Sequence, residues 1–487
     1  MMSDIRTLQP AAVWQWFADI CAIPHPSHHE QALRDFILQR ATEKGLTAER
    51  DTVGNIRLCK PASPGLEHAP AVALQAHIDM VPQKGEGSSH CFETDPIRTH
   101  IEEGWLYADN TTLGADNGIG AAMALAVAFA DDIPHPPLNI ILTVEEETGM
   151  GGALALDPDW LDVPYLINLD SEDAGSLFIG CAGGRDVHLH VPAAFQAAQG
   201  QAVSVRVSGL KGGHSGIDIN KGRGNAILML AQLLAATELP FSLASLQGGS
   251  LRNVLPRSAE AVVVYANGSA LALQLLAAAQ RMEEEMAAAE TGLEIELLPA
   301  ATPALALNPA DSRRVIDTCI NLPNGVLRMS DHFPGVVETS ISLGHAELKV
   351  DGLHLLSLMR SLAESPKDAV GERLAALARL SGGQLTLDND YPGWQPDPAS
   401  ALLARAQEVL HRFYGRPARI EIMHAGLECG ILKSKAPHTD MISFGPDIRA
   451  AHSPKECVHI DSVGECWQIL LTLLGSSLPQ NNTVQAS

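Results

Sequence analysis

The sequence predicts an α/β fold, a mixed, mostly parallel sheet with flanking helices, interrupted by a long inserted α+β domain. Short apolar runs alternate with helical patterns in residues 1–184, which is typical of strand–helix–strand units. The same alternation returns after residue 391, so the last segment is expected to complete the first sheet. We therefore predict a first domain formed by 1–184 and 392–487, and an inserted domain formed by 185–391.

The first domain opens with two helical patterns between residues 11 and 46. The segments that follow are assigned by length and periodicity, because strands are short apolar runs and helices repeat every three to four residues. Strands are expected at 71–75, 138–144, 165–169, 420–423 and 441–444, and helices at 119–130, 401–413 and 463–474. The tail after Pro479 is expected to be disordered.

The inserted domain shows two loosely repeated sets of elements, which predict a two-lobed structure. The first set has strands at 202–207, 260–265 and 293–298, with helices at 225–237 and 271–289. The second set has helices at 311–322 and 367–379, with strands at 335–343, 346–350 and 384–387.

Composition narrows the possible partners. The 487 residues carry a formal net charge of −24, from 57 acidic and 33 basic side chains, so phosphate backbones and anionic headgroups are repelled. Nucleic acid and membrane are therefore excluded as expected partners, and the absence of an apolar leader or of a run of about 18 apolar residues predicts a cytoplasmic protein. The eight cysteines form no C-x-x-C pair, so a metal would need His, Asp and Glu ligands.

A histidine and an aspartate follow the strand expected at 71–75. Residues two apart on a strand point to the same side, so His77 and Asp79 share a face. Asp79 could orient the imidazole, or both side chains could bind a metal separately. The sequence leaves these alternatives open.

Three further segments place acidic side chains at expected strand ends. Asp116 lies in a glycine-rich turn before a helix, where a simple helix cap is the ordinary explanation. The run 145–147 consists of three glutamates after an apolar strand, and a solvated loop is the ordinary explanation for such a run. Asp170 closes another apolar strand, where aspartate often forms a turn.

A histidine near the C-terminus, His452, completes the set, although a lone histidine is usually structural. Taken together, these residues are the types that a co-catalytic metal pair requires: one bridging aspartate, with a histidine and a carboxylate for each ion. The combination predicts a site for two divalent metal ions.

Several strings in the same order resemble the zinc dipeptidases of the aminoacyl-histidine dipeptidase family, also called peptidase D, within a wider group of carboxypeptidase and acylase relatives. The resemblance runs through most of the chain, and it is specific because many strings occur together. The strings are QAHIDMVPQK (75–84), LGADNGIG (113–120), EETGM (146–150), NLDSE (168–172), CAGG (181–184), GGHSG (212–216) and HSP (452–454).

The resemblance implies a role for each residue of the site. Asp79 would orient a ligand, and Glu146 would be the general base that takes a proton from the water between the metals. This assignment anchors the register on Gly149 and makes Glu145 an extra carboxylate, where the family has another residue type. The implied metal ligands are His77, Asp116 as the bridge, Glu147, Asp170 and His452.

By the same resemblance, the inserted domain would act as a lid that presents side chains to the substrate. His214 would assist the oxyanion, and Arg360 would suit a C-terminal carboxylate through its two-pronged guanidinium. Asn253 and Gly426 would also hold substrate, although a turn-forming Asn and a surface Arg are the ordinary explanations of Asn253 and Arg360.

The implied activity is hydrolysis of unblocked dipeptides, expected to carry a C-terminal histidine, by two divalent ions that would be zinc, although cobalt or manganese suits the same ligands. The metal core fits two enzyme alternatives equally well, an N-acyl amino acid hydrolase and a tripeptidase or carboxypeptidase. A catalytically silent binding protein of the same fold is the non-enzyme alternative. A homodimer is expected.

Overall fold

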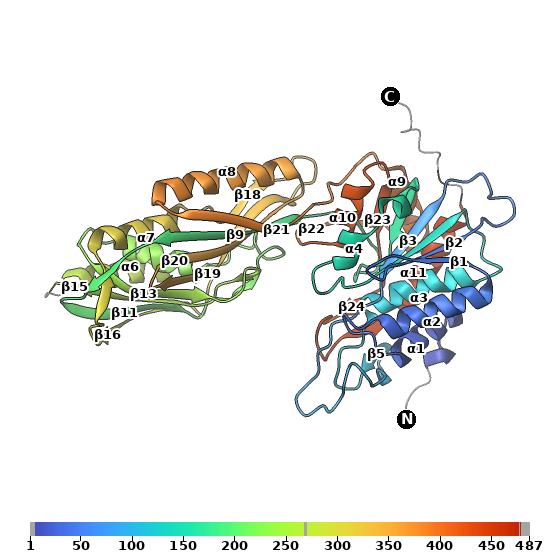
Figure 1. Ribbon diagram of the computed structural model, residues 1–487, viewed down its shortest axis with the longest axis horizontal. Coiled ribbons are helices and arrows are strands. Elements are labelled where there is room, and N and C mark those ends of the chain that lie inside the picture. The colour runs from blue at the N-terminus through green and yellow to red at the C-terminus, as the bar shows by residue number, and fades with distance from the viewer. Residues whose placement is uncertain (1–4, 267–269, 477, 479–487) are drawn as a thin grey trace. The chain divides into compact units, whose positions relative to one another are not determined.

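The computed structural model describes residues 5–266, 270–476 and 478, and the chain divides into two compact units (Figure 1). Unit 1 comprises Met1–Gly180, Trp394–Ile422 and Leu427–Ser487, and unit 2 comprises Cys181–Gly393 and Met423–Gly426. The short segment Met423–Gly426 differs from the expected division, which places it in the first domain. It joins unit 2 because Ala182 N donates to Met423 O at 2.9 Å and the Ser340 hydroxyl lies 2.7 Å from His424 Nε2.

Unit 1 is built on an eight-stranded sheet whose central strands are parallel, which confirms the predicted fold class. The parallel strands are β6 (Leu138–Thr143), β3 (Val72–His77), β7 (Tyr165–Asn168) and β23 (Asp440–Ser443). The outer strands, β1 (Thr47–Arg50) and β2 (Ile56–Lys60) on one side and β8 (Ser176–Cys181) and β22 (Arg419–Met423) on the other, complete the order β1-β2-β6-β3-β7-β23-β8-β22.

Helices pack on this sheet through small apolar side chains. The helix α3 (Ala115–Phe129) is alanine-rich, buried along nearly its whole length, and packs on β3 and β6. The helix α1 (Ala11–Ala22) packs in turn on α3, and α9 (Ala401–Tyr414) packs on β23 and on α11 (Ile460–Leu474). The unit also contains α2 (Gln31–Lys44), α4 (Gly151–Ala155), α10 (Glu428–Lys435), η1 (Ile5–Thr7) and η2 (Pro158–Leu161).

The parallel arrangement positions the candidate site. Parallel strands end at the same edge of the sheet, so the residues that follow β3, β6 and β7 are brought together there. A small antiparallel sheet borders the loop that carries His452. Its strands are β24 (Ile448–Arg449), β25 (Cys457–His459), β5 (Trp105–Ala108) and β4 (Thr99–Glu102).

Unit 2 contains one antiparallel nine-stranded sheet that both predicted lobes share. The strands expected at 335–343 and 346–350 form one strand, β19 (Val337–Lys349), whose register against β20 shifts between Leu343 and His345. Its neighbour β20 (Gly352–Ser361) was not expected. The order is β16 (Glu294–Ala300), β11 (Gln201–Ser208), β15 (Ala259–Tyr265), β13 (Ser242–Gly249), β19, β20, β9 (Gly183–Pro192) and β21 (Gln384–Tyr391), and β18 (Gly325–Met329) pairs with β19.

The helices of unit 2 cover one face of this sheet and form its hydrophobic core with it (Figure 1). They are α5 (Ala226–Ala235), α6 (Ala270–Met286), α7 (Pro309–Asn321) and α8 (Glu364–Ser381). Two small two-stranded sheets complete the unit, β10 (Phe195–Ala197) with β17 (Leu305–Leu307) and β12 (Gly213–His214) with β14 (Val254–Leu255).

Two expectations concern the ends of the chain and the membrane. The tail after Pro479, expected to be disordered, lies outside the described residues. Among the helices of the described part of the chain, none is both long and apolar enough to cross a membrane.

The cap of α5 supports a prediction about the stability of unit 2. The buried Asn225 side chain accepts from Ile227 N at 3.1 Å and donates to Leu343 O at 2.8 Å, so it satisfies groups of two elements. We expect Asn225→Ala to lower the free energy of unfolding of unit 2 by about 2–3 kcal/mol, because a cap is lost and a buried carbonyl is left without a donor. Asn308 caps α7 through Asp311 N at 2.8 Å, and Asn308→Ala should cost only about 1 kcal/mol.

Urea unfolding followed by far-UV circular dichroism measures this difference. The chain's six tryptophans, at 14, 16, 105, 160, 394 and 467, all belong to unit 1, so tryptophan fluorescence reports that unit separately. Equal losses in the two variants would contradict the role assigned to the Asn225 amide.

Candidate metal centre

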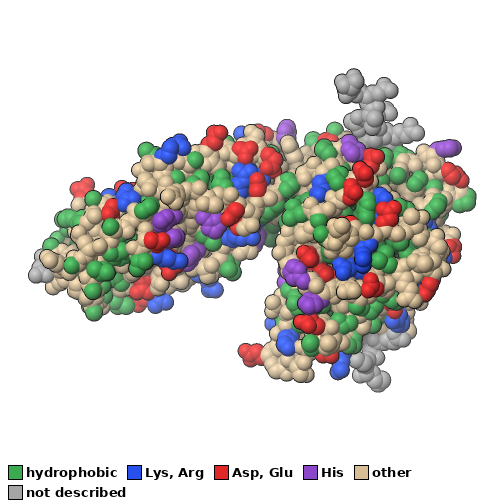
Figure 2. Space-filling view, in the orientation of Figure 1, with side chains coloured by type: hydrophobic (Ala, Val, Ile, Leu, Met, Phe, Trp, Pro, Cys, Tyr) green, Lys and Arg blue, Asp and Glu red, His purple; other side chains and the backbone are tan. Residues whose placement is uncertain are grey.

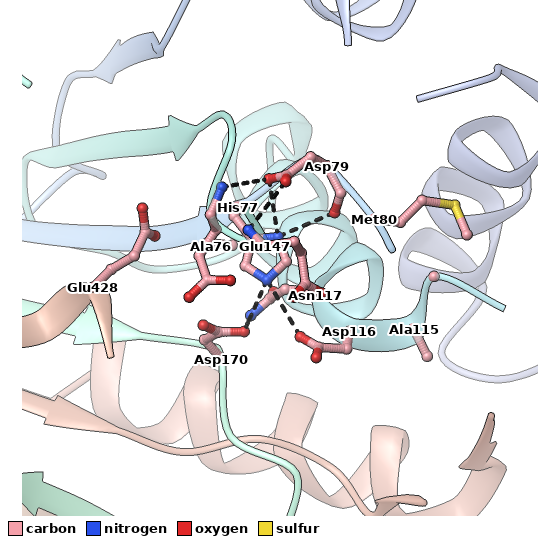
Figure 3. Close-up of polar contacts among 12 residues, drawn as sticks. Ala76, His77, Asp79, Met80, Ala115, Asp116, Asn117, Glu147, Asp170 and Glu428 are labelled. Carbon is pink, nitrogen blue, oxygen red and sulfur yellow. Dashed lines mark hydrogen bonds and ion pairs between the residues drawn. The ribbon is translucent and has the colours of Figure 1, made fainter. Parts of the chain in front are cut away.

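His77 ends the fully buried strand β3 and faces two carboxylates (Figure 3). Its Nδ1 lies 3.1 Å from the backbone oxygen of Asp79 and can donate a proton there. Its Nε2 lies 3.3 Å from Asp116 Oδ1 and 3.4 Å from Asp170 Oδ1. With its proton on Nδ1, the ring presents the Nε2 lone pair toward a cation between the two carboxylates.

Asp79 lies two residues after His77, and its carboxylate accepts hydrogen bonds from the backbone of the glutamate loop. Its Oδ1 accepts from Glu146 N at 3.0 Å, and its Oδ2 accepts from Glu147 N at 3.2 Å and from the Ser27 hydroxyl at 2.7 Å. Burial alone raises the pKa of Asp79, but His77 and these donors outweigh it and lower the pKa. Asp79 is therefore a charged anchor that positions the two glutamates after β6.

Asp116, at the start of α3, lies between two histidines. Its Oδ1 is the one 3.3 Å from His77, and its Oδ2 lies 3.1 Å from His452 Nε2. The same His452 nitrogen is 3.0 Å from Glu147 Oε2. Two three-residue groups therefore share Asp116, and in each group the candidate ligand atoms lie within 4.8 Å of one another: His77, Asp116 and Asp170, and Asp116, Glu147 and His452.

The electrostatics of these groups fit two divalent cations. Hydrogen bonds that His452 donates to Asp116 and Glu147 raise the pKa of His452 to about 11, so the position strongly favours positive charge. Glu147 Oε1 is buried and, within the described residues, has no hydrogen-bond partner. A buried oxygen of this kind is costly unless a cation compensates it. Histidine nitrogens with carboxylate oxygens suit zinc, cobalt or manganese.

The three consecutive glutamates point to different surroundings. Glu145 pairs with the exposed His28 (Nδ1 to Oε1, 3.3 Å), and 38% of its side chain is exposed. Glu146 and Glu147 instead belong with His77 to a third group of ligand atoms within 4.8 Å. Burial raises the pKa of Glu146 well above its usual value, so this carboxyl holds a proton more readily than a solvated one does.

Sequence reasoning missed Glu456, which holds the loop that carries Asp116. Its buried carboxylate accepts four backbone hydrogen bonds: Oε2 from Leu113 N at 2.8 Å and Gly114 N at 3.1 Å, and Oε1 from Ala115 N at 2.8 Å and Asp116 N at 3.2 Å. Because Glu456 is four residues after His452, one segment carries a candidate ligand and fixes the backbone of another. In the sequence, the position of Glu456 just after the HSP string (452–454) was the feature that could have indicated its role.

A second missed feature is a buried polar layer beneath the site. Glu428 Oε2 accepts from Gln75 Nε2 at 2.6 Å and from the Thr143 hydroxyl at 2.7 Å. Gln75 Oε1 accepts from Asn168 Nδ2 at 2.5 Å, and Asn168 Oδ1 accepts from Asp170 N at 3.2 Å. Gln75 and Asn168 stand two residues before His77 and Asp170, on the same side of their strands, which is the signal that could have found them.

The other predicted site residues lie in unit 2. His214 Nδ1 accepts from Gly216 N at 3.2 Å and Ile217 N at 3.1 Å, so the proton of the neutral ring is on Nε2. Burial, then the charge of Arg360, lowers the pKa of His214 to about 4, so the ring is neutral near pH 7. Asn253 is beside it in the fold, because its backbone oxygen accepts from Ser215 N at 2.9 Å.

Arg360 lies on β20 and is buried, contrary to the surface position that is ordinary for arginine. Its Nη1 donates to the Tyr391 hydroxyl at 3.2 Å, and its Nε has no partner among the described residues. Gly216 brings these groups together, because a Cβ there would be 3.1 Å from Arg360 Nε and 3.2 Å from His214 Cε1. Gly426 closes the Met423–Gly426 segment of unit 2.

The chain is similar to known proteins along nearly its whole length. The family model described as "Peptidase family M20/M25/M40" matches residues 73–476. The chain is similar to the "Cytosol non-specific dipeptidase" of Escherichia coli (strain K12), with 44% identity over 480 residues that cover 97% of this chain and 99% of the relative.

Solved structures show the same likeness. The "Aminoacylhistidine Dipeptidase from Vibrio alginolyticus" is 43% identical, has a TM-score of 0.93, and is matched over 98% of each chain. The aminopeptidase PepT of Bacillus cereus is 15% identical with a TM-score of 0.55, over 96% of this chain and 98% of that one, and shares the fold.

Glu456 supports a prediction about metal affinity. We expect Glu456→Gln to weaken binding of divalent metal about 10–100-fold, because an amide NH₂ would face backbone N–H groups and release the loop that carries Asp116. Glu465→Gln is the matched control, since Glu465 is a glutamate of unit 1 that accepts from the Tyr414 hydroxyl at 3.0 Å. Zinc dissociation constants measured by competition with a chelator report the effect. Equal affinity in the two variants would rule out positioning by Glu456.

Proposed function

Because this chain belongs to peptidase family M20/M25/M40 and is 44% and 43% identical to two proteins that are named dipeptidases, we propose that it hydrolyses unblocked dipeptides with two divalent metal ions, zinc in the first instance. The observation that carries the proposal is the position of Asp116, whose two oxygens face two histidines that each have a further carboxylate. The name of the Escherichia coli relative and the acidic composition support a cytoplasmic location. A homodimer stays a prediction.

The residues of the centre divide the work. His77 and Asp170 would hold one ion, Glu147 and His452 the other, with Asp116 between them. Such ions, when bound, polarise the substrate carbonyl and lower the pKa of the attacking water. The three ligand carboxylates balance three of the four positive charges, so a surplus is left to stabilise the oxyanion.

Proton transfer falls to Glu146. Its carboxylate is buried among the ligand groups, and positive charge nearby would offset the burial that raises its pKa. It would take a proton from the attacking water and pass it to the leaving amine. Asp79 would position other residues and would not contact the substrate. Its carboxylate accepts from the backbone N–H of Glu146, and its backbone oxygen orients His77.

Substrate selection is assigned to unit 2. A buried guanidinium whose side-chain hydrogen bond, within the described residues, is to a neutral hydroxyl attracts a carboxylate, so we assign the C-terminal carboxylate of the dipeptide to Arg360. His214, neutral with a proton on Nε2, can donate to a developing oxyanion. Asn253 and Gly426 are proposed to contact the same substrate. The names of the two similar proteins support a broad dipeptide range that includes Xaa-His.

A substrate panel tests the proposed function. We expect Xaa-His and other unblocked dipeptides to be cleaved in preference to tripeptides and N-acetyl amino acids. C-terminally amidated dipeptides should have a kcat/KM at least about 10²-fold lower, because the buried charge of Arg360, left without its partner, costs about 3 kcal/mol or more. Release of the free amino acid, followed by chromatography, measures each rate. A preference for N-acetylated substrates would overturn the proposal.

The adjacent glutamates test the mechanism. Glu146→Gln should lower kcat about 10²–10⁴-fold because an amide cannot take the proton, while bound metal stays at the wild-type level. Glu145→Gln is the matched control and should keep activity within a few-fold, since Glu145 faces His28. Steady-state rates and elemental analysis distinguish the outcomes. An inactive Glu145→Gln beside an active Glu146→Gln would shift the roles by one residue.

A further inference from the structure

The face of the unit 2 sheet opposite its helices carries histidines on neighbouring strands. On β9, Val187, Leu189 and Val191 are buried in the core, whereas His188 and His190 alternate with them on the other side. Figure 2 shows histidine side chains gathered with acidic ones on the surface of this unit. Packing of the core does not require these polar residues.

His190 and His354 are direct partners across two antiparallel strands. His354 on β20 is in register with His190 on β9, and the two imidazoles stack with centroids 4.5 Å apart and planes at 25°. Asp351 approaches both rings: its Oδ1 is 2.9 Å from His354 Nε2, and its Oδ2 is 3.7 Å from His190 Nε2. Ligand atoms of the three residues lie within 4.8 Å of one another.

The backbone holds this geometry in place. Asp351 lies in the tight turn between β19 and β20, immediately before Gly352. Gly352 has a φ of +134°, and a Cβ there would be 2.2 Å from the oxygen of Val191. Only glycine allows this approach, so the turn is fixed against β9 beside His190. The three side chains therefore start from adjacent, well-defined positions.

A neighbouring group shows what distinguishes this trio. Asp186, His188 and Asp388 also bring ligand atoms within 4.8 Å. Asp186, however, accepts from Arg252 Nη1 at 2.6 Å and from Asn389 Nδ2 at 2.9 Å, so a guanidinium already neutralises it. In the described part of the chain, the ion pairs of Asp351 are with His190 and His354 alone. Its charge is therefore available to a cation.

We propose that His190, Asp351 and His354 bind a divalent transition-metal ion at a site that shares no residue with the centre of unit 1. Two imidazoles and one carboxylate favour zinc, nickel or copper, whereas magnesium and calcium prefer oxygen ligands alone. The trio is partly exposed, which leaves an approach for the ion and room for water as further ligands. The ion would link β9, β20 and the turn between β19 and β20.

Zinc binding to the whole enzyme, already loaded at its own centre, tests the site. Equilibrium dialysis against rising free zinc, followed by elemental analysis, compares the wild type with His190→Gln, His354→Gln and Asp351→Asn. We expect each variant to lose about one zinc per chain relative to the wild type. His188→Gln is the matched control on the same strand and face, and it should bind as the wild type does.

Binding of Cu²⁺ provides a second measurement, which does not depend on the number of metal ions per chain. The extra Cu²⁺ should show electron paramagnetic resonance couplings from two imidazole nitrogens in the wild type and from one in either histidine variant. Equal zinc in all proteins, or a loss in His188→Gln as well, would overturn the proposal. Peptidase activity is expected to be unchanged in the three variants, so failure here is distinguishable from failure of the proposed function.

Discussion

The structure of unit 1 depends on holding several carboxylates close together, largely buried, at the edge of a parallel sheet. Removing a carboxylate from water costs several kcal/mol unless donors or cations replace the lost hydration. The chain meets this cost in two ways. Asp79 and Glu456 are surrounded by N–H and O–H donors, whereas Asp116, Glu147 and Asp170 mainly face imidazoles and the side-chain amide of Asn117. The donors and His77 lower the pKa of Asp79, whereas burial raises the pKa of Glu456 to about 7 in spite of its backbone N–H donors. The other three carboxylates are suited to bind cations.

This division explains why the centre requires segments far apart in the chain. Glu456 reaches back across about 340 residues to the backbone of 113–116, and the same segment supplies His452 opposite Asp116. The loop that carries Asp116 is therefore incomplete until the C-terminal segment has packed against it. Ligand geometry in this fold is a property of the assembled sheet, because no single loop contains more than part of the set.

Much of this arrangement could be predicted from the sequence, for identifiable reasons. The central strands were predicted because buried parallel strands read as short apolar runs, and the residues at their ends followed from that. The sequence did not predict that β19 is one continuous strand. Gly344 interrupts the apolar run there, whereas the backbone continues through a shift in register. Glu456 and Glu428 were missed because a carboxylate that accepts backbone N–H groups from a distant loop looks the same in sequence as a solvated one.

In unit 2, the two faces of the sheet place different constraints on the residue types that they carry. Toward the helices, each inward position must be apolar and of the right volume, so sequence there is governed by packing. On the open face, an exposed histidine–carboxylate contact contributes only about 0–1 kcal/mol. Stability alone therefore gives little reason for two histidines in register beside an aspartate in a tight turn. A bound ligand would supply that reason, and the nitrogen and oxygen donors of this group suit a transition-metal ion.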